Sequence, residues 1–141
     1  MPEAVVAITG ASGAQYGVRL VDELLGAGWQ VSLIITSAGA INLDLECGIT
    51  PHDIGERDGV TLEDNNNLAA RSASGSARFD AYVVCPASGT TVGKIAAGIS
   101  DNLATRSALV ALKERRKLIV VPREAPVSTP HLEAMARMSA W

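Results

Sequence analysis

Arg123 and Glu124 are adjacent in the sequence and directly follow an apolar run, residues 118–122 (Leu-Ile-Val-Val-Pro). A guanidinium binds phosphates and carboxylates, and a carboxylate works as an acid, a base or the partner of a positive charge. Two interpretations of the pair stay open. Glu124 holds Arg123 in a salt bridge, or Arg123 binds an anionic ligand while Glu124 moves a proton.

Two segments rich in glycine and hydroxyl groups also follow apolar runs. Gly10-Ala11-Ser12-Gly13 comes after residues 4–9, and Ser88-Gly89-Thr90-Thr91 comes after residues 81–86. If each segment opens a helix, its free backbone N–H groups favour a phosphate. The first segment is neither a GxGxxG motif nor a Walker A loop. The alternatives are a plain tight turn for the first segment and a simple N-cap for the second.

Other charged residues are harder to interpret singly. Glu46 ends a predicted helix, where an acidic side chain opposes the helix dipole, and this mild cost hints at a use. The basic residues concentrate between positions 106 and 123, and Arg115-Arg116-Lys117 is by default a solvated helix end. His52 and His131 are isolated, and neither the histidines nor the cysteines have metal-ligand spacing, so we expect no metal site.

The elements that must position these residues alternate along the chain. Apolar runs predict strands over residues 4–9, 31–36, 81–86 and 118–122. Helical patterns cover 16–25, 38–45, 90–97 and 103–113, and a last helix runs from 129 to the end, while 48–78 reads as loops with at most one short strand or helix. This alternation predicts a three-layer, Rossmann-like (flavodoxin-like) α/β fold, a parallel sheet with helices on both faces. Ligands bind such sheets beyond the carboxyl ends of the strands, where the polar segments fall.

Composition sets further bounds. The chain has 141 residues, the length of one domain, and a formal net charge of −3, which argues against a nucleic-acid binder. No apolar run approaches the ~20 residues that span a bilayer, and the N-terminus has no basic region typical of a signal peptide. Two cysteines, Cys47 and Cys85, form no disulfide framework, so we expect a cytoplasmic protein.

Several motifs recur in the order seen in one known family. They are residues 10–20 (GASGAQYGVRL), Glu46, Ser74-Gly75-Ser76, residues 113–118 (KERRKL), residues 121–126 (VPREAP) and His131-Leu132. Together they resemble the UbiX-type flavin prenyltransferases, within the wider group of FMN-binding flavoproteins. The cysteine decarboxylases of that group carry a catalytic His before the third-strand region and a PxMN motif after the fourth strand. This sequence has neither, which favours the prenyltransferase branch.

The resemblance implies a set of ligands and roles. FMN would be bound by Gly10, Ala11, Ser12, Thr36, Ser88, Gly89, Thr90, Thr91 and Arg106. The second substrate would be dimethylallyl phosphate, whose phosphate would meet Lys113 and Arg123. Ser12, Glu46 and Glu124 would move protons and stabilise the allylic cation while reduced FMN is alkylated at N5 and then C6, with no metal. The family also implies a large homo-oligomer, such as a dodecamer, with sites at subunit interfaces, and a product that is passed to a decarboxylase.

This sequence departs from the family pattern in two places. Leu109 stands where the family commonly has Asp, and family members continue for one more strand and helix that bring a Tyr and a basic residue to the prenyl phosphate. We therefore expect one FMN-binding domain over residues 1–141 without that C-terminal segment. Two alternatives to a prenyltransferase remain: an FMN-binding carrier without prenyl transfer, and a redox or decarboxylase relative.

Overall fold

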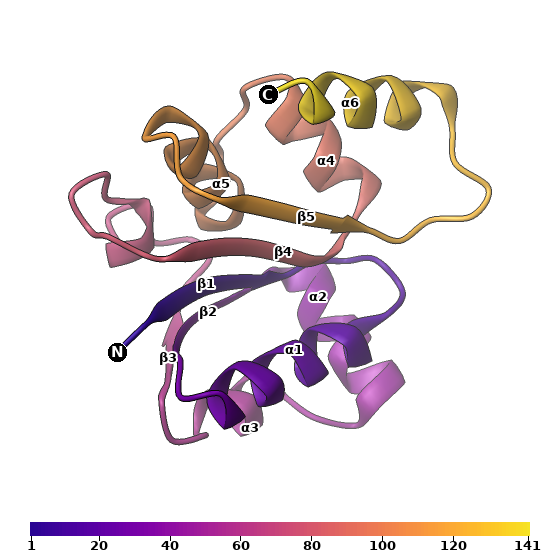
Figure 1. The fold of residues 1–141 in the computed structure, drawn as a ribbon. Helices are drawn as coiled ribbons and strands as arrows, with labels where there is room; N and C mark the ends of the chain where they lie inside the picture. Colours follow the sequence, from indigo (N-terminus) through magenta and orange to yellow (C-terminus); the bar gives the residue numbers. More distant parts are fainter.

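Five parallel strands form one sheet in the order β3-β2-β1-β4-β5 in the computed structural model, which describes residues 1–141 (Figure 1). The strands are β1 (Glu3–Ile8), β2 (Gln30–Ile35), β3 (Val60–Glu63), β4 (Ala81–Ala87) and β5 (Leu118–Pro122). Because β1 pairs with both β2 and β4, the chain winds outward in two directions from the centre of the sheet. Such an order places the switch point between β1 and β4.

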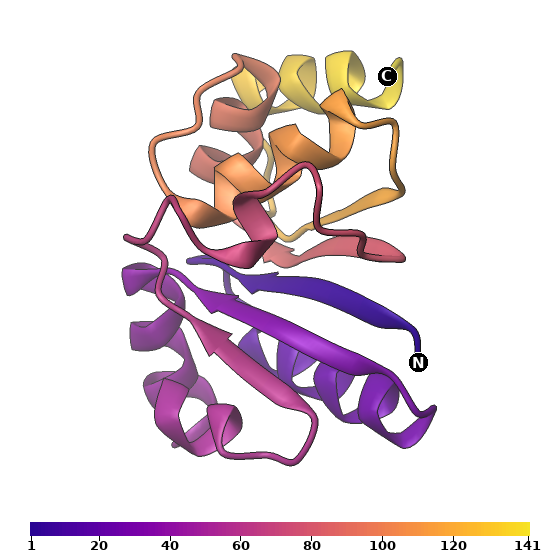
Figure 2. The same ribbon diagram turned by 90° about the vertical axis from the view of Figure 1, so that its left-hand side faces the viewer.

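Helices cover both faces of this sheet (Figures 1 and 2). One face carries α1 (Ala14–Gly26), α2 (Ser37–Asn42), the π-helical turn η1 (Leu43–Cys47) and α3 (Pro51–Gly55). The other carries α4 (Gly89–Ala96), α5 (Leu103–Lys113) and α6 (Thr129–Ser139), and the 3₁₀ turn η2 (Arg71–Ala73) packs beside α5. The three-layer, flavodoxin-like fold predicted from the sequence is confirmed. None of the helices has both the length and the apolar character needed to cross a membrane.

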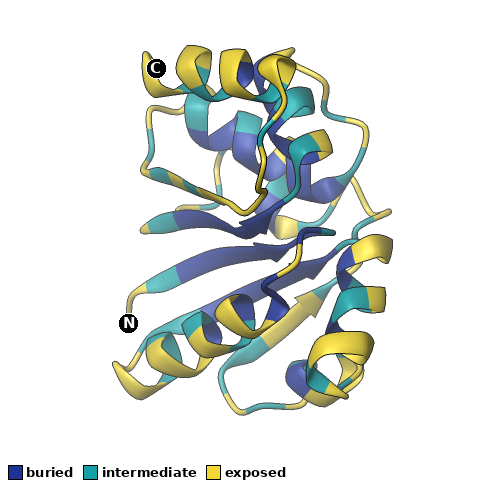
Figure 3. Cartoon of the chain, turned by 90° about the vertical axis from the view of Figure 1, so that its right-hand side faces the viewer, coloured by how far each residue is buried: buried dark blue, intermediate teal, exposed yellow.

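The side chains of the central strands alternate between two apolar cores. Val5 and Ala7 of β1 belong to the core under α4, α5 and α6, whereas Val6 and Ile8 belong to the core under α1 and its neighbours. Figure 3 shows the central strands buried, while the outer faces of the helices are exposed. A strand buried on both faces must be apolar along its whole length, which is why these runs predicted a parallel sheet.

Two glycines let helices approach the strands that carry the polar segments. A Cβ atom added to Gly17 in α1 would lie 2.6 Å from the carbonyl oxygen of Cys85, at the end of β4. A Cβ atom added to Gly39 in α2 would lie 2.4 Å from the carbonyl oxygen of Ile8, at the end of β1. Both distances are shorter than van der Waals contact, so the absence of a side chain sets how closely these helices pack.

Three sequence-based boundaries are corrected by the structure. The segment 48–78 contains both α3 and the edge strand β3, besides η2, whereas at most one strand or helix was expected. The predicted helix 38–45 is α2 followed by the π-helical turn η1, so Glu46 lies within η1 and does not end an α-helix. The last helix ends at Ser139 and does not continue to the final residue.

Candidate active site

A buried threonine joins the ends of β1 and β4 at the switch point of the sheet. The Thr9 hydroxyl donates to the carbonyl oxygen of Pro86 at 2.7 Å and accepts from the backbone N–H of Ser88 at 2.8 Å. Thr9 is fully buried, so both bonds are shielded from water. Thr9 could not be singled out from the sequence, because a threonine at the end of a strand carries no distinctive pattern. Its bonds fix the two glycine-containing segments beside each other.

A polar cleft of about 400 Å³ opens over this junction. Its lining comes from the segments that follow three strands, namely Gly10, Ala11 and Ser12 after β1, Ser88, Gly89 and Thr90 after β4, and Arg123, Glu124, Ala125 and the α6 residue His131 after β5. An adjoining hollow is lined by Ser12, Gly13, Gln15, Tyr16, Glu46 and Arg123. Ser12 and Arg123 line both spaces. The structure thus brings together most of the residues that the sequence singled out.

The N-terminus of α4 faces the cleft with open backbone donors. Ser88 is the N-cap, and its hydroxyl accepts from the Thr91 N–H at 3.1 Å and lies 2.9 Å from the Thr91 hydroxyl. The simple N-cap role proposed as an alternative is therefore real for Ser88 and Thr91. The first N–H groups of a helix have no partner within the helix, which leaves those of Gly89 and Thr90 for a ligand. This helix start suits an anion.

The N-terminus of α1 is already occupied by an anion of the chain itself. The Glu46 carboxylate accepts from the Gly13 N–H at 2.9 Å and from the Ala14 N–H at 3.0 Å. Its charge therefore complements the positive end of α1 and does not oppose the end of its own helix. Glu46 is exposed to the adjoining hollow and stays accessible to a ligand there.

Arg123 and Glu124 do not pair with each other. Glu124 Oε2 lies 2.9 Å from Nδ1 of His131, whereas Arg123 has no acidic group within ion-pair distance. The aliphatic stem of Arg123 lies beside Gly13, where its Cγ is 3.6 Å from the position a Cβ atom would take. The proposed Arg123–Glu124 salt bridge is therefore absent. The cleft contains an unpaired guanidinium next to a carboxylate that is held by a histidine.

Four predicted site residues line neither the cleft nor the adjoining hollow within one chain: the buried Thr91, Thr36, Arg106 and Lys113. Thr36 is the N-cap of α2, where its hydroxyl accepts from the Gly39 N–H at 3.0 Å. Arg106 is exposed on α5 and its side chain has no partner in the chain. Lys113 ends α5 just before β5 begins, whereas Arg123 follows the end of β5; the five residues of this strand span ~17 Å. Lys113 and Arg123 of one chain therefore lie toward opposite ends of β5, and only Arg123 lines the cleft.

The basic run after α5 is in part structural. Arg116 donates to the carbonyl oxygens of Ala77 and Gly75 at 2.6 and 2.5 Å, and to the Tyr82 hydroxyl at 3.1 Å. The expectation of a solvated helix end is wrong for this residue. Arg116 ties the Ser74-Gly75-Ser76 segment to the sheet.

Burial raises the pKa of the Cys85 thiol, in keeping with a core residue that takes no part in chemistry.

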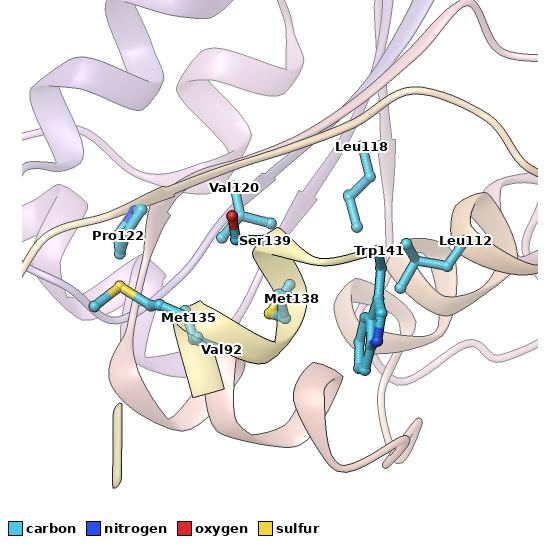
Figure 4. Close-up of a pocket in the computed structure, with 9 residues that line it drawn as sticks. All are labelled: Val92, Leu112, Leu118, Val120, Pro122, Met135, Met138, Ser139 and Trp141. Atoms are coloured by element: carbon cyan, nitrogen blue, oxygen red, sulfur yellow. The ribbon is translucent and has the colours of Figure 1, made fainter. Parts of the chain in front are cut away.

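A second groove, of about 340 Å³, lies between β5 and helices α4, α5 and α6. Figure 4 shows its lining, in which Leu118 and Val120 of β5 face Met135 and Met138 of α6. Seven of its nine lining residues are hydrophobic. A groove of this kind has no set of donors for a phosphate, so the candidate site is the polar cleft.

Comparison with known proteins gives matches that extend over nearly the whole chain. The Flavoprotein family matches residues 2–141. The flavin prenyltransferase UbiX of Thermoplasma acidophilum is 45% identical over 135 residues, which cover 96% of this chain and 73% of that protein.

Solved structures of similar sequence have the same fold. AnUbiX (PadA1), in complex with FMN and dimethylallyl pyrophosphate, superposes with a TM-score of 0.94 at 34% identity, covering 99% of this chain and 73% of that one. A dodecameric FMN-dependent Ubix-like decarboxylase from Escherichia coli O157:H7 gives a TM-score of 0.93 at 37% identity, covering 98% of this chain and 75% of that one.

Proposed function

The chain belongs to the Flavoprotein family and, within it, to the UbiX-type flavin prenyltransferases, and from this membership we propose that it transfers a dimethylallyl group to reduced FMN. The observation that carries the proposal is the unpaired Arg123, which lines both the cleft that contains Glu124 and the open N-terminus of α4 and the adjoining hollow that contains Glu46. A fixed cation can bind a leaving phosphate while fixed carboxylates stabilise an allylic cation.

The polar cleft suits FMN in its size and its donors. A volume of about 400 Å³ falls within the ~300–1,000 Å³ range of ligand sites, and the N–H groups of Gly89 and Thr90 are open to an anion. Gly10, Ala11, Ser12, Ser88 and Thr90 line the cleft and would hold the flavin. Thr36, Thr91 and Arg106 stay predicted contacts from the family resemblance. Reduced FMN supplies the nucleophilic N5 and C6 positions.

The donor's phosphate would bind Arg123, and we propose that Lys113 of a neighbouring copy joins it. The separation of Lys113 from Arg123 along β5, and the absence of Lys113 from the lining of the cleft, support a lysine supplied by another chain. The dodecameric neighbour supports assembly into a homo-oligomer. The dimethylallyl pyrophosphate bound by AnUbiX supports a dimethylallyl ester as the donor. We propose the monophosphate for this chain.

The remaining residues would handle protons and charge. Ser12 lines both the cleft, which contains Glu124, and the adjoining hollow, which contains Glu46. A proton released as the new C–N and C–C bonds form would pass through Ser12 to one of these carboxylates. The carboxylates would also stabilise the dimethylallyl cation as its bond to the phosphate breaks. Transfer of the product to a separate decarboxylase and a cytoplasmic location remain predictions.

The test is the mass of the flavin after anaerobic incubation with reduced FMN and dimethylallyl phosphate. A gain of one five-carbon unit supports prenyl transfer. FMN that stays bound but unmodified would instead support the second candidate, a flavin-binding protein without transfer. This candidate has one specific support, since the 37% identical neighbour from Escherichia coli is described as an FMN-dependent decarboxylase. Incubation without donor is the control for flavin binding alone.

A further inference from the structure

His131 was not predicted to have a role, yet its ring lies in the polar cleft beside Glu124. It is the third residue of α6 and packs over the first residue of α4. A Cβ atom added to Gly89 would lie 2.1 Å from Cε1 and 2.4 Å from Nδ1 of the ring. Only a glycine at position 89 leaves room for the ring in this place. The position of His131 thus depends on the α4 start that borders the cleft.

The ring holds the Glu124 carboxylate through one nitrogen. Nδ1 of His131 lies 2.9 Å from Oε2 of Glu124, and the His131 side chain is 30% exposed. Because an ionised carboxylate only accepts hydrogen bonds, Nδ1 carries the proton in this contact. The neighbouring Arg123 is the natural alternative partner for Glu124, since it is adjacent in sequence and has no acidic partner of its own.

We propose that His131 is a positioning residue that keeps Glu124 away from Arg123, so that the Arg123 guanidinium stays free to bind the phosphate of the prenyl donor. The inference rests on the proposed function and adds a residue to that site. Without the ring, Glu124 turns to Arg123 and neutralises it. Gly89 is needed for the same role, because a side chain at this position would displace the His131 ring.

Calorimetric titration of the FMN-loaded protein with dimethylallyl phosphate tests this directly. The Kd should rise about 10- to 100-fold in His131→Ala, the factor expected when a charged hydrogen bond is lost. His131→Gln keeps a donor for Glu124 and should recover most of the affinity. Gly89→Ala should weaken binding in the same direction as His131→Ala. His52→Ala, which removes an exposed histidine of α3, is the matched control and should leave Kd unchanged.

The deciding variant is the double mutant His131→Ala/Glu124→Gln. A neutral side chain at 124 cannot neutralise Arg123, so the double mutant should bind donor as tightly as Glu124→Gln alone. A histidine that only supports the packing of α6 predicts no such recovery. Persistent weak binding in the double mutant, or wild-type binding in His131→Ala, overturns the proposal.

Inorganic phosphate serves as a second probe in the same titrations. It reports the availability of Arg123 whether or not the protein transfers a prenyl group. If wild type makes no prenylated flavin but His131→Ala loses phosphate binding and the double mutant regains it, the proposed function fails and the role of His131 stands. If wild type makes the product and the double mutant is not rescued, the role of His131 fails alone.

Discussion

The Glu46 carboxylate caps α1 by accepting the N–H of its N-cap residue, Gly13, 33 residues earlier in the chain, at 2.9 Å. This bond explains why an acidic residue stands at position 46, where the sequence alone indicated an unfavourable helix end. It also places a negative charge beside Arg123 without an ion pair between them, because both residues line the hollow next to the cleft. Glu46 therefore has a structural role that can be separated from its proposed catalytic one.

Replacing Glu46 should separate these two roles. Glu46→Ala removes the cap of α1 and should cost about 0.5–2 kcal/mol of unfolding free energy. Glu46→Gln keeps an acceptor oxygen, so its melting temperature should stay near that of wild type. Its rate of flavin prenylation should nevertheless fall by about 100-fold or more, because the charge is lost. Thermal unfolding and product formation, measured on both variants, test this.

Thr50→Ala is the matched control for Glu46. Thr50 caps α3 through the Asp53 N–H and takes no part in the cleft, so its loss should lower stability without changing the prenylation rate. If Glu46→Gln prenylates flavin at the wild-type rate, Glu46 has only the structural role.

The two hydrogen bonds of the Thr9 hydroxyl, which link the ends of β1 and β4, predict the effect of a second variant. Thr9→Val keeps the shape of the side chain but leaves the Ser88 N–H without its partner, while the Pro86 carbonyl keeps only its bond from the backbone N–H of residue 9. Buried polar groups without partners cost about 1–3 kcal/mol, which denaturant unfolding can measure. FMN affinity should fall as well, because the two loops of the cleft lose their link. Thr9→Ser should recover both properties. A Val variant with wild-type stability and FMN affinity would contradict the role of the Thr9 hydroxyl in linking the two loops.

Two glycines of helices on opposite faces of the sheet should respond in opposite ways to alanine. Gly17→Ala places a methyl group against the Cys85 carbonyl oxygen, and forcing α1 away should cost about 1–3 kcal/mol. Gly93→Ala in α4 meets no atom within 4 Å, so the gain in helix propensity should stabilise the protein by about 0.5–1 kcal/mol. Equal effects of the two substitutions in denaturant unfolding would show that the helix–strand distance is not set by Gly17.

The proposed sharing of a site between copies can be tested by complementation. Arg123→Ala and Lys113→Ala should each lower prenylation by about 10- to 100-fold, as expected for a lost charged contact to phosphate. If Lys113 acts on a neighbouring copy, co-expressed mixtures of the two variants contain some sites with both native residues. Such mixtures should regain activity that neither variant has alone. Mixtures that stay at the level of the separate variants would place both residues in one chain's site or in none.

The periodic parts of the fold could be predicted, whereas the edge and the contacts between distant segments could not. Central strands such as β1 and β4 are apolar throughout because both faces are buried, and this makes them visible in the sequence. β3 is a four-residue edge strand with exposed Thr61 and Leu62, so residues 60–63 have no such signature.

The candidate site followed the same division. The segments after β1, β4 and β5 were predicted to meet because parallel strands end at one edge. The partners of individual side chains were not predictable: Glu46 with α1, Glu124 with His131, and Arg116 with the 75–77 loop join residues far apart in sequence or depend on loop conformation. Lys113 shows the limit most clearly, since motif order placed it with Arg123 although β5 separates the two.

The most direct test of prenyl transfer in this cleft compares wild type with Arg123→Ala in one anaerobic reaction series. Each protein is loaded with reduced FMN, dimethylallyl phosphate is added at a fixed concentration near the wild-type KM, and the mass of the extracted flavin is followed over time. We predict a flavin heavier by one five-carbon unit in wild type, and bound but largely unmodified FMN in Arg123→Ala. Unmodified FMN in wild type, or equal product in both proteins, would contradict the assignment of this cleft as a prenyl-transfer site.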